Sequence, residues 1–431
     1  MTPHEGPALR SPDRSSRRVP GVPQLVTAVA ALNVLSFVDR QLLVVLAPLL
    51  IADLGLTRAQ IGLLVGISFI GVFAVGTLVV GVWADRCNRP RLIALGLVIW
   101  SAATALTSTA GGMTSLVVWR SLVGVGEAAL PVTALAMIGD RVSGRHLGLA
   151  TGMFYAGVPI GFALSFALSG VIGPWLGWRA CFLALGVLGL LGTLLVRRLE
   201  DPPRRGAAPA TGTGGPSVWS AIGERPMLLV LSAAGALLVY ASASSQHAIT
   251  WLVAERGFDY SRAALVSAGV ILAAGLAGNL AIGAITDRAR QAHPAGRLLA
   301  LAGVSVIGLL ASAGFYTASP LSWRFFACWI VAYGFLLGWY GSLVAAVDER
   351  APEGRRAAVL GFVLLVINLL GVATGPYVTG LIGDRSSLTE GLLWSLAPAA
   401  LGATLLALAG LQELLRGRAR CYARSLPEED P

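Results

Sequence analysis

The chain has 431 residues and a mean hydropathy of +0.74, and 55% of its residues are hydrophobic whereas only 13% are charged. A single soluble domain of this length could not bury so much apolar surface, so the composition excludes an ordinary soluble protein and predicts many membrane-spanning helices. The formal net charge is +10, and every basic residue is an arginine, which is typical of GC-rich bacterial genomes. The four cysteines show no C-x-x-C spacing, so we expect neither a disulfide framework nor a metal site.

Twelve apolar runs follow one another, and each is long enough to cross about 30 Å of hydrocarbon. The first six lie at 22–51, 59–83, 92–110, 113–138, 146–172 and 178–196. The second six lie at 227–254, 263–285, 298–316, 320–347, 357–382 and 389–415. We therefore predict an all-α membrane protein of two six-helix bundles, with these boundaries: tail 1–21, bundle 22–196, linker 197–226, bundle 227–415 and tail 416–431.

The arginines are distributed unequally between the two sides of the predicted membrane. If both termini lie in the cytoplasm, the cytoplasmic segments hold 24 arginines, the outer loops hold six, and two lie inside spans. The positive-inside rule therefore predicts cytoplasmic termini in the bacterial inner membrane. We attribute the basic charge to this topology and to contact with anionic lipids, and we expect a monomer without a nucleic-acid partner.

Two loops at equivalent places in the two halves share a pattern. The loop after the second run reads GVWADRCNRPR (81–91), and the loop after the eighth reads GAITDRARQAHPAGR (283–297). Three positions recur 202 residues later: Gly81, Asp85 and Arg86 as Gly283, Asp287 and Arg288. Asp-Arg pairs can be mere positive flanks of helices, but the matched glycine spacing favours duplicated halves. Such halves are typical of transporters with a substrate site between them.

The first of these loops resembles the signature loop of the major facilitator superfamily, G-x-x-x-D-R-x-x-R. The resemblance implies that Asp85 faces the N-terminal end of span 11, where a helix dipole favours an anion. It also implies that Arg89 pairs with Asp140 at the end of span 4, and that these contacts shut the cytoplasmic gate. No arginine stands three residues after Arg288, so we expect a weaker second latch. The candidate gating residues are Gly81, Asp85, Arg86, Arg89, Asp140, Arg145, Asp287 and Arg288.

Several stretches of the first half resemble the Spinster subfamily of that superfamily. They are LNVLSFVDRQLLVVLAPLLIADLGLTRAQIGLL (32–64), ADRCNRPRLIALGLVIWS (84–101), RSLVGVGEAALP (120–131) and GMFYAGVPIG (152–161). The subfamily typically carries an Asp-Arg pair in span 1 and an Arg with Gly-Glu-Ala in span 4. The resemblance implies transport of an amphiphilic anion such as a lysophospholipid or a sphingoid phosphate.

Four charged residues, Asp39, Arg40, Arg120 and Glu127, lie well inside the apolar runs. Each would cost roughly 2.5–3.5 kcal/mol at a lipid-facing helix centre, so they should face one another or water. Helical rise places Asp39 between Glu127 and Arg120 in depth, and the Arg120 side chain leans away from Glu127.

We therefore expect Arg120 to pair with Asp39, and Glu127, or alternatively Asp39, to bind and release protons. Arg40 would then offer a fixed cation to an anionic substrate. The alternative is a purely structural ionic cluster that holds spans 1 and 4 together. Buried ion pairs stabilise proteins poorly, which favours a role in proton coupling for Asp39, Arg120 and Glu127.

Polar and aromatic side chains in spans 1, 7 and 10 are further candidates for substrate contact, although aromatic residues can equally be packing or interfacial anchors. The candidate substrate-binding residues are Asn33, Arg40, Tyr240, Gln246, His247, Tyr333, Trp339 and Tyr340.

Motifs of soluble enzymes are missing from the sequence: it has no G-x-S-x-G, no H-E-x-x-H and no Walker loop. We therefore expect no enzymatic activity and no cofactor, and transport driven by a gradient, of protons in the first place. The alternatives are transport or export of other organic anions or drugs, and a lipid sensor that transports nothing.

Overall fold

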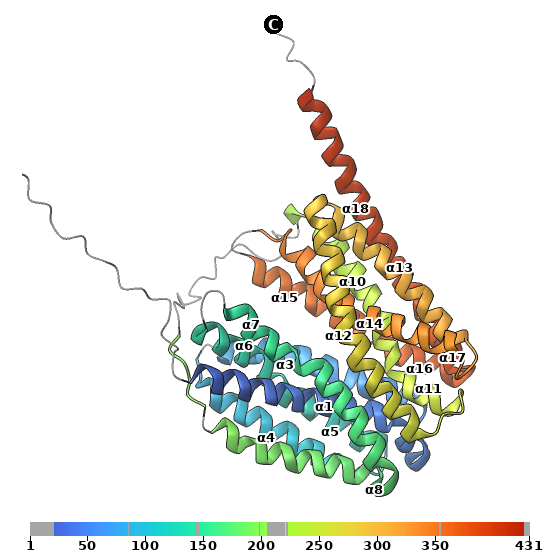
Figure 1. Ribbon diagram of the computed structural model, residues 1–431. Helices are drawn as coiled ribbons and strands as arrows, with labels where there is room; N and C mark the ends of the chain where they lie inside the picture. The colour runs from blue at the N-terminus through green and yellow to red at the C-terminus, as the bar shows by residue number, and fades with distance from the viewer. Residues whose placement is uncertain are drawn as a thin grey trace, which may run out of the picture.

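The computed structural model of the protein describes residues 21–84, 86–142, 146–197, 199–204, 220, 223–352 and 355–425. Every regular element in these residues is a helix, and Figure 1 shows the helices gathered in two bundles. The all-α fold is therefore confirmed. The tail residues 1–20 and 426–431 and most of the predicted linker, 205–219, lie outside the described part.

The N-terminal half comprises α1 (Val22–Leu54), α2 (Arg58–Val65), η1 (Ile67–Gly71), α3 (Val72–Ala84), α4 (Arg89–Thr107), α5 (Met113–Glu127), α6 (Ala129–Arg141), α7 (Leu147–Tyr155) and α8 (Gly157–Val196). The C-terminal half comprises α10 (Met227–Ser244), η3 (Ser245–His247), α11 (Ala248–Ala254), α12 (Tyr260–Ala292), α13 (Gly296–Thr317), α14 (Trp323–Asp348), α15 (Arg356–Val366), η4 (Ile367–Val372), α16 (Gly375–Arg385), α17 (Leu388–Trp394) and α18 (Leu396–Ser425).

Eleven helical stretches of the described residues are long and apolar enough to cross a membrane, and the stretch Leu147–Val196 accounts for two predicted spans. Its 50 residues would reach about 75 Å as one straight helix, more than twice the hydrocarbon thickness. The chain instead turns at Gly177, whose φ of 74° is in the left-handed region, shortly after Pro174. The two parts correspond to the predicted spans 146–172 and 178–196, in agreement with twelve crossings.

Short polar residues fix where many of the helices begin. The side chains of Thr57, Asn88, Asp259, Ser322 and Ser387 each accept a hydrogen bond from a backbone N–H three residues later. Such caps satisfy backbone donors that the first turn of a helix leaves free. The apolar runs between the caps supply the remaining helix, so hydropathy and capping together set the element boundaries.

The two halves approach most closely at one end of the molecule. We call it the closed end; it holds Leu54, Arg58, Glu255 and Asp384, and the opposite, basic end holds Val22, Arg89 and Arg350. Figure 1 shows the bundles converging near α11, α16 and α17 and diverging towards α7 and α15.

Glycine allows this close approach between the halves. A Cβ atom on Gly62 would lie 2.3 Å from the Pro376 carbonyl oxygen, and one on Gly66 would lie 2.1 Å from that of Ala373. Both contacts join span 2 to span 11, where each span contains a π-helical turn, η1 or η4. The absence of a side chain at these two glycines therefore allows the two spans to pack closely.

Candidate functional site

The four intramembrane charges of α1 and α5 form one buried cluster. The Nε atom of Arg40 lies 2.6 Å from Oε2 of Glu127, and the Ser36 hydroxyl donates to the same oxygen at 2.9 Å. Nη1 of Arg120 lies 3.5 Å from Oδ1 of Asp39. The cluster therefore contains two acid–base pairs and has no net charge, as a low-dielectric environment demands.

The partners of the two acids differ from the expected ones in one respect. Arg120 lies beside Asp39 as the sequence suggests, and the Thr104 hydroxyl donates to the other oxygen of Asp39. Glu127, however, is paired with Arg40, whereas we expected Arg40 to be free for substrate. The reason is that Glu127 is fully buried and would otherwise be an uncompensated buried anion.

Each acid of the cluster keeps one oxygen without a hydrogen-bond donor among the described residues, namely Oδ1 of Asp39 and Oε1 of Glu127. Both side chains are almost inaccessible, with exposed fractions of 2% and 0%. The Arg40 side chain is the most accessible of the four, at 17%. The arrangement can therefore hold a proton on a buried oxygen while one cation stays within reach of a ligand.

Phenylalanine rings surround the two guanidinium groups. Arg40 lies 4.4 Å from the ring centroid of Phe73 and 4.7 Å from that of Phe37, and Arg120 lies 4.5 Å from that of Phe69. Aromatic faces attract cations and are themselves apolar, so they hold both arginines without adding charge. Phe69 and Phe73 lie one helical turn apart in span 2, and this spacing could have indicated from the sequence that both rings face the arginines. Hydropathy alone does not distinguish them from other apolar residues of the span.

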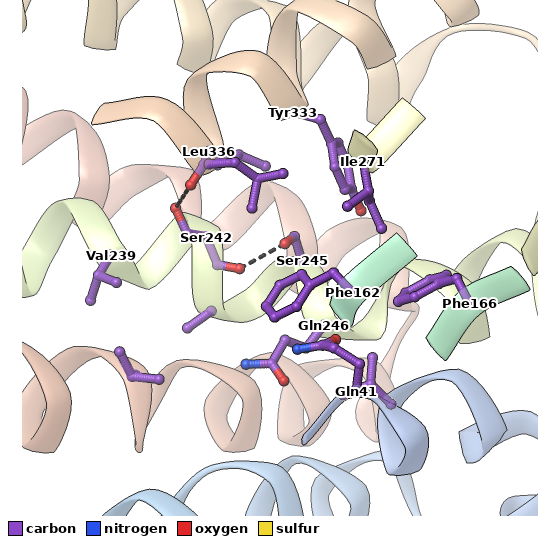
Figure 2. Close-up of a pocket in the computed structure, with 14 residues that line it drawn as sticks. Gln41, Phe162, Phe166, Val239, Ser242, Ser245, Gln246, Ile271, Tyr333 and Leu336 are labelled. Atoms are coloured by element: carbon purple, nitrogen blue, oxygen red, sulfur yellow. Dashed lines mark hydrogen bonds between the residues drawn. The ribbon is translucent and has the colours of Figure 1, made fainter. Parts of the chain in front are cut away.

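A pocket of about 190 Å³ lies between the halves, next to this cluster (Figure 2). Of the predicted substrate-binding residues, Gln246 and Tyr333 line it. Phe162 of its wall packs on Phe37 at 5.7 Å between ring centroids, and Phe37 in turn contacts Arg40. The pocket is thus connected to the charge cluster through two aromatic rings.

Several polar lining residues were not predicted. Gln41 enters the pocket from α1, and Ser242 and Ser245 enter it from the C-terminal half. Figure 2 shows Gln41 and Gln246 pointing into the same space from opposite halves. Gln41 directly follows the Asp-Arg pair. A polar residue inside an apolar span could have indicated from the sequence that this position faces a polar site.

The structure does not bring the other candidates to this pocket. Asn33 donates to the Phe154 carbonyl at 2.7 Å, next to the break between α7 and α8, and Nε2 of His247 lies 2.7 Å from the Pro376 carbonyl. The Trp339 indole donates to Ser242 at 3.1 Å and packs edge-on against Tyr340. Asn33, Arg40, Tyr240, His247, Trp339 and Tyr340 all lie outside its lining.

A polar latch joins the halves at the closed end. The carboxylate of Asp384 accepts hydrogen bonds from the backbone N–H groups of Arg58 at 2.8 Å and Ala59 at 2.9 Å, at the start of α2. The Arg58 side chain donates to the Gly383 carbonyl and lies 3.6 Å from Glu255. A carboxylate at a helix N-terminus is favoured by both the free N–H groups and the helix dipole. The sequence analysis missed this latch, although Asp384 and Arg385 form another Asp-Arg pair at a span end.

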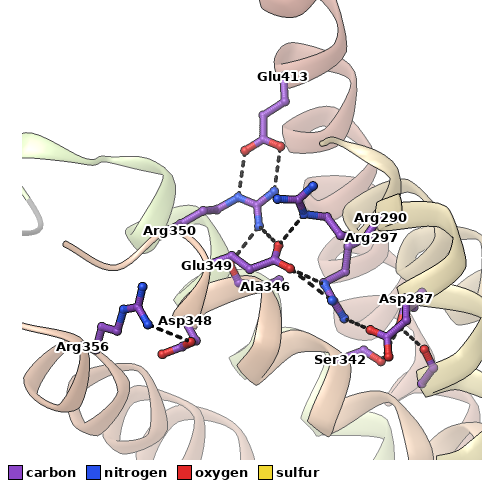
Figure 3. A network of polar contacts seen from close by, with 12 residues as sticks. Asp287, Arg290, Arg297, Ser342, Ala346, Asp348, Glu349, Arg350, Arg356 and Glu413 are labelled. Atoms are coloured by element: carbon purple, nitrogen blue, oxygen red, sulfur yellow. Dashed lines mark hydrogen bonds and ion pairs between the residues drawn. The ribbon is translucent and has the colours of Figure 1, made fainter. Parts of the chain in front are cut away.

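Charge pairs also occur at the basic end, within each half. Arg89 lies 2.5 Å from Asp140, as the family resemblance implies, and 2.7 Å from Asp201. In the C-terminal half, Arg297 lies 2.8 Å from Asp287 and 3.1 Å from Glu349 (Figure 3). The second half therefore has an arginine at this place although none stands three residues after Arg288.

The remaining gating candidates have less defined surroundings. Gly81 lies in α3, where an added Cβ atom would meet no other atom within 4 Å, and Arg86 and Arg288 are exposed. Asp85 and Arg145 lie outside the described residues.

Comparison with known proteins gives a consistent result. The family model of the Major Facilitator Superfamily matches residues 29–376. The chain is 29% identical to the 3-(3-hydroxy-phenyl)propionate transporter of Escherichia coli over 415 residues, 92% of this chain and 95% of that protein. It is 26% identical to the sphingosine-1-phosphate transporter SPNS2 of Danio rerio over 343 residues, 73% of this chain and 67% of that protein.

A solved structure shares the fold. It is that of a bacterial homologue of the human lysosomal transporter Spinster in an inward-facing and unoccupied conformation. The TM-score is 0.82 at 21% sequence identity, and the match covers 92% of this chain and 98% of the other.

The pairing of Arg40 with Glu127 predicts a strong energetic coupling. Either Arg40→Gln or Glu127→Gln should lower the free energy of unfolding by about 3–5 kcal/mol, because each leaves a buried charge unpaired. The double variant should lose clearly less than the sum. The measurement is denaturant or thermal unfolding of the purified protein in detergent.

The control is the pair of Arg179 and Asp53, whose side chains are 47% and 45% exposed. Exposed pairs contribute at most about 1 kcal/mol, so Arg179→Gln and Asp53→Asn should show almost no coupling. Additive losses at Arg40 and Glu127 would contradict the pairing.

Proposed function

Since the chain belongs to the major facilitator superfamily and is a Spinster-like transporter of organic substrates rather than an enzyme, we propose that it works by alternating access with proton coupling. The substrate we propose is an amphiphilic anion such as a lysophospholipid or a sphingoid phosphate. The single observation that supports this best is the ion pair of Arg40 and Glu127 beside the inter-half pocket.

The pair suggests how a proton and an anion act together. Protonation of Glu127 removes its charge, and the Arg40 guanidinium then has no anionic partner at Oε2. An anionic substrate head that enters from the pocket past Phe37 takes that place. Substrate therefore binds best when Glu127 carries a proton, and loss of the proton restores the ion pair and expels the anion. Arg120 and Asp39 form the neighbouring ion pair. These two residues can exchange partners with Arg40 and Glu127.

The pocket lining supports a substrate that is partly apolar. Phe162, Phe166 and Ile271 form apolar walls, and Gln41, Gln246 and Tyr333 can hydrogen-bond to neutral polar groups. Drug-sized ligands fill pockets of about 300–1,000 Å³, so a space of about 190 Å³ takes only one part of a long amphiphile.

This small volume also favours a second candidate, a compact organic acid. The similar protein of Escherichia coli is named for a phenylpropionate, whereas that of Danio rerio is named for sphingosine-1-phosphate. Both are anions with an apolar part, and both match a cation beside an aromatic pocket.

The orientation we propose places the basic end in the cytoplasm, in the inner membrane of a bacterium. It rests on the excess of arginine in the loops at that end. The closed end then faces outward. Both halves of one chain line the pocket, which is consistent with a monomer as the working unit.

The substrate assignment is tested by measuring uptake by counterflow in proteoliposomes. The compounds tested as transported substrates are a lysophospholipid, a sphingoid phosphate and a phenylpropionate. Gln41→Ala and Gln246→Ala should each raise KM about two- to twelvefold, because an amide hydrogen bond contributes about 0.5–1.5 kcal/mol. Gln24→Ala, at an exposed position of the basic end, should leave KM unchanged. Specific binding without any counterflow would instead support a lipid sensor.

Proton coupling is tested by the pH dependence of the same uptake. In the parent protein substrate affinity should rise as pH falls, because a proton on Glu127 frees Arg40. Glu127→Gln mimics the protonated acid, so its affinity should be high and nearly independent of pH, while exchange driven by a proton gradient is lost. If Glu127→Gln kept the parental pH profile, Glu127 would not be the coupling site.

The closed-end latch predicts how the halves separate. Asp384→Ala removes an anion from the start of α2, an interaction that contributes about 1 kcal/mol, so the population open at that end should rise about fivefold. Distances between spin labels at Trp175 and Trp323, which are 86% and 78% exposed, report the separation. Arg385→Ala, at the adjacent exposed position, is the control, and an equal shift there would refute the latch.

A further inference from the structure

We propose that a groove between α10 and α18, at the basic end of the C-terminal half, binds an anionic glycerophospholipid of the adjacent leaflet. The groove has a volume of about 700 Å³. It combines an apolar wall with a charged rim, so it differs in place and chemistry from the pocket between the halves. The rim contains Glu224, Arg225, Arg350, Glu413 and Arg416.

The apolar wall has the direction and exposure that an acyl chain needs. Met227 and Val230 lie one turn apart on α10, and Leu405 and Leu408 lie one turn apart on α18. Leu408 is 57% exposed, so the wall opens towards the surface of the bundle. A chain lying along both helix axes would cover these side chains.

The rim carries an excess of positive charge after its own pairs are counted. Arg350 makes two hydrogen bonds to Glu413, at 2.8 and 2.7 Å, and Glu224 is paired with Arg355 at 3.0 Å. Both acids of the rim are therefore already neutralised. Arg225 and Arg416 form no ion pair with a described residue, although Arg225 donates one bond to the Arg350 carbonyl.

The space continues past the pair of Arg350 and Glu413. A second hollow of about 400 Å³ shares these two residues and Arg416, and it adds Arg290, His293, Pro294 and Glu349. Glu349 is paired with Arg290 and Arg297 at 3.1 Å each. Figure 3 shows Glu413 of α18 bonded to Arg350. Arg290 lies beside Arg350 and donates a hydrogen bond to Glu349. A phosphate at the rim could therefore extend a polar headgroup into this hollow, while its acyl chains stay on the apolar wall.

Arginines above an apolar groove, where helices leave the hydrocarbon, match a phospholipid better than a soluble anion. A soluble anion would use the rim and leave the wall uncovered. The apolar wall lies on α10 and α18 of the C-terminal half, away from the pocket between the halves, so the proposed lipid site does not rest on the proposed transport cycle.

The test is native mass spectrometry and thermal unfolding of the full chain in nanodiscs of phosphatidylcholine alone or with phosphatidylglycerol. Phosphatidylglycerol should be retained and should stabilise the protein. Each arginine near the membrane surface contributes a factor of about five, so Arg225→Gln with Arg416→Gln should lower retention roughly 25-fold. Arg91→Gln, an exposed arginine of the same end in the other half, should change nothing.

A second variant separates the wall from the rim. Val230→Trp fills the groove and leaves both arginines, so it should also abolish lipid retention while the fold, monitored by unfolding in phosphatidylcholine, is kept. Equal retention of phosphatidylcholine, equal protection by inorganic phosphate or glycerol phosphate, or full retention by the double arginine variant would each overturn the proposal.

Discussion

The cost of charge in hydrocarbon is the constraint on which the centre of this protein depends. Asp39, Arg40, Arg120 and Glu127 can be buried together because each acid has a cation within reach and the sum of the charges is zero. That requirement fixes how α1 lies against α5, because a rotation of either helix would separate a pair. It also places the most accessible cation beside the pocket, so the same contacts that make burial tolerable create a site for an anion.

At the basic end, each half contains a similar ion pair between the start of one helix and the end of another. Arg89 at the start of α4 holds Asp140 at the end of α6, and Arg297 at the start of α13 holds Glu349 at the end of α14. The helices involved occupy corresponding places in the two repeats. In each half, an arginine in the first turn of one helix therefore pairs with an acid at the end of the next span.

The fold could be predicted almost completely from hydropathy, since each crossing needs its own apolar run. The four residues of the charge cluster could be identified from the sequence, but only one of the two ion pairs could be predicted. Helical spacing gives the depth of each residue in the membrane, but it does not tell which faces of two helices are in contact. The sequence therefore gives Glu127 no cation partner and assigns Arg40 to a substrate, whereas the structure pairs the two. Gln41 and the latch of Asp384 with Arg58 were missed for a similar reason. Arg58 and Asp384 are 326 positions apart, and the packing of α2 on α16 alone brings them together.

The latch at the closed end has an asymmetry that bears on how such a protein can evolve. One side of it is a side chain, Asp384, while the other consists of main-chain N–H groups at residues 58 and 59. Substitution removes those donors only when it introduces proline, whereas a change at Asp384 removes the acceptor of both bonds. The Arg58 side chain adds its own contacts, to the Gly383 carbonyl and to Glu255. Selection can therefore change the Asp384 part of the latch mainly through one codon, while its two main-chain donors persist through most changes in the first turn of α2.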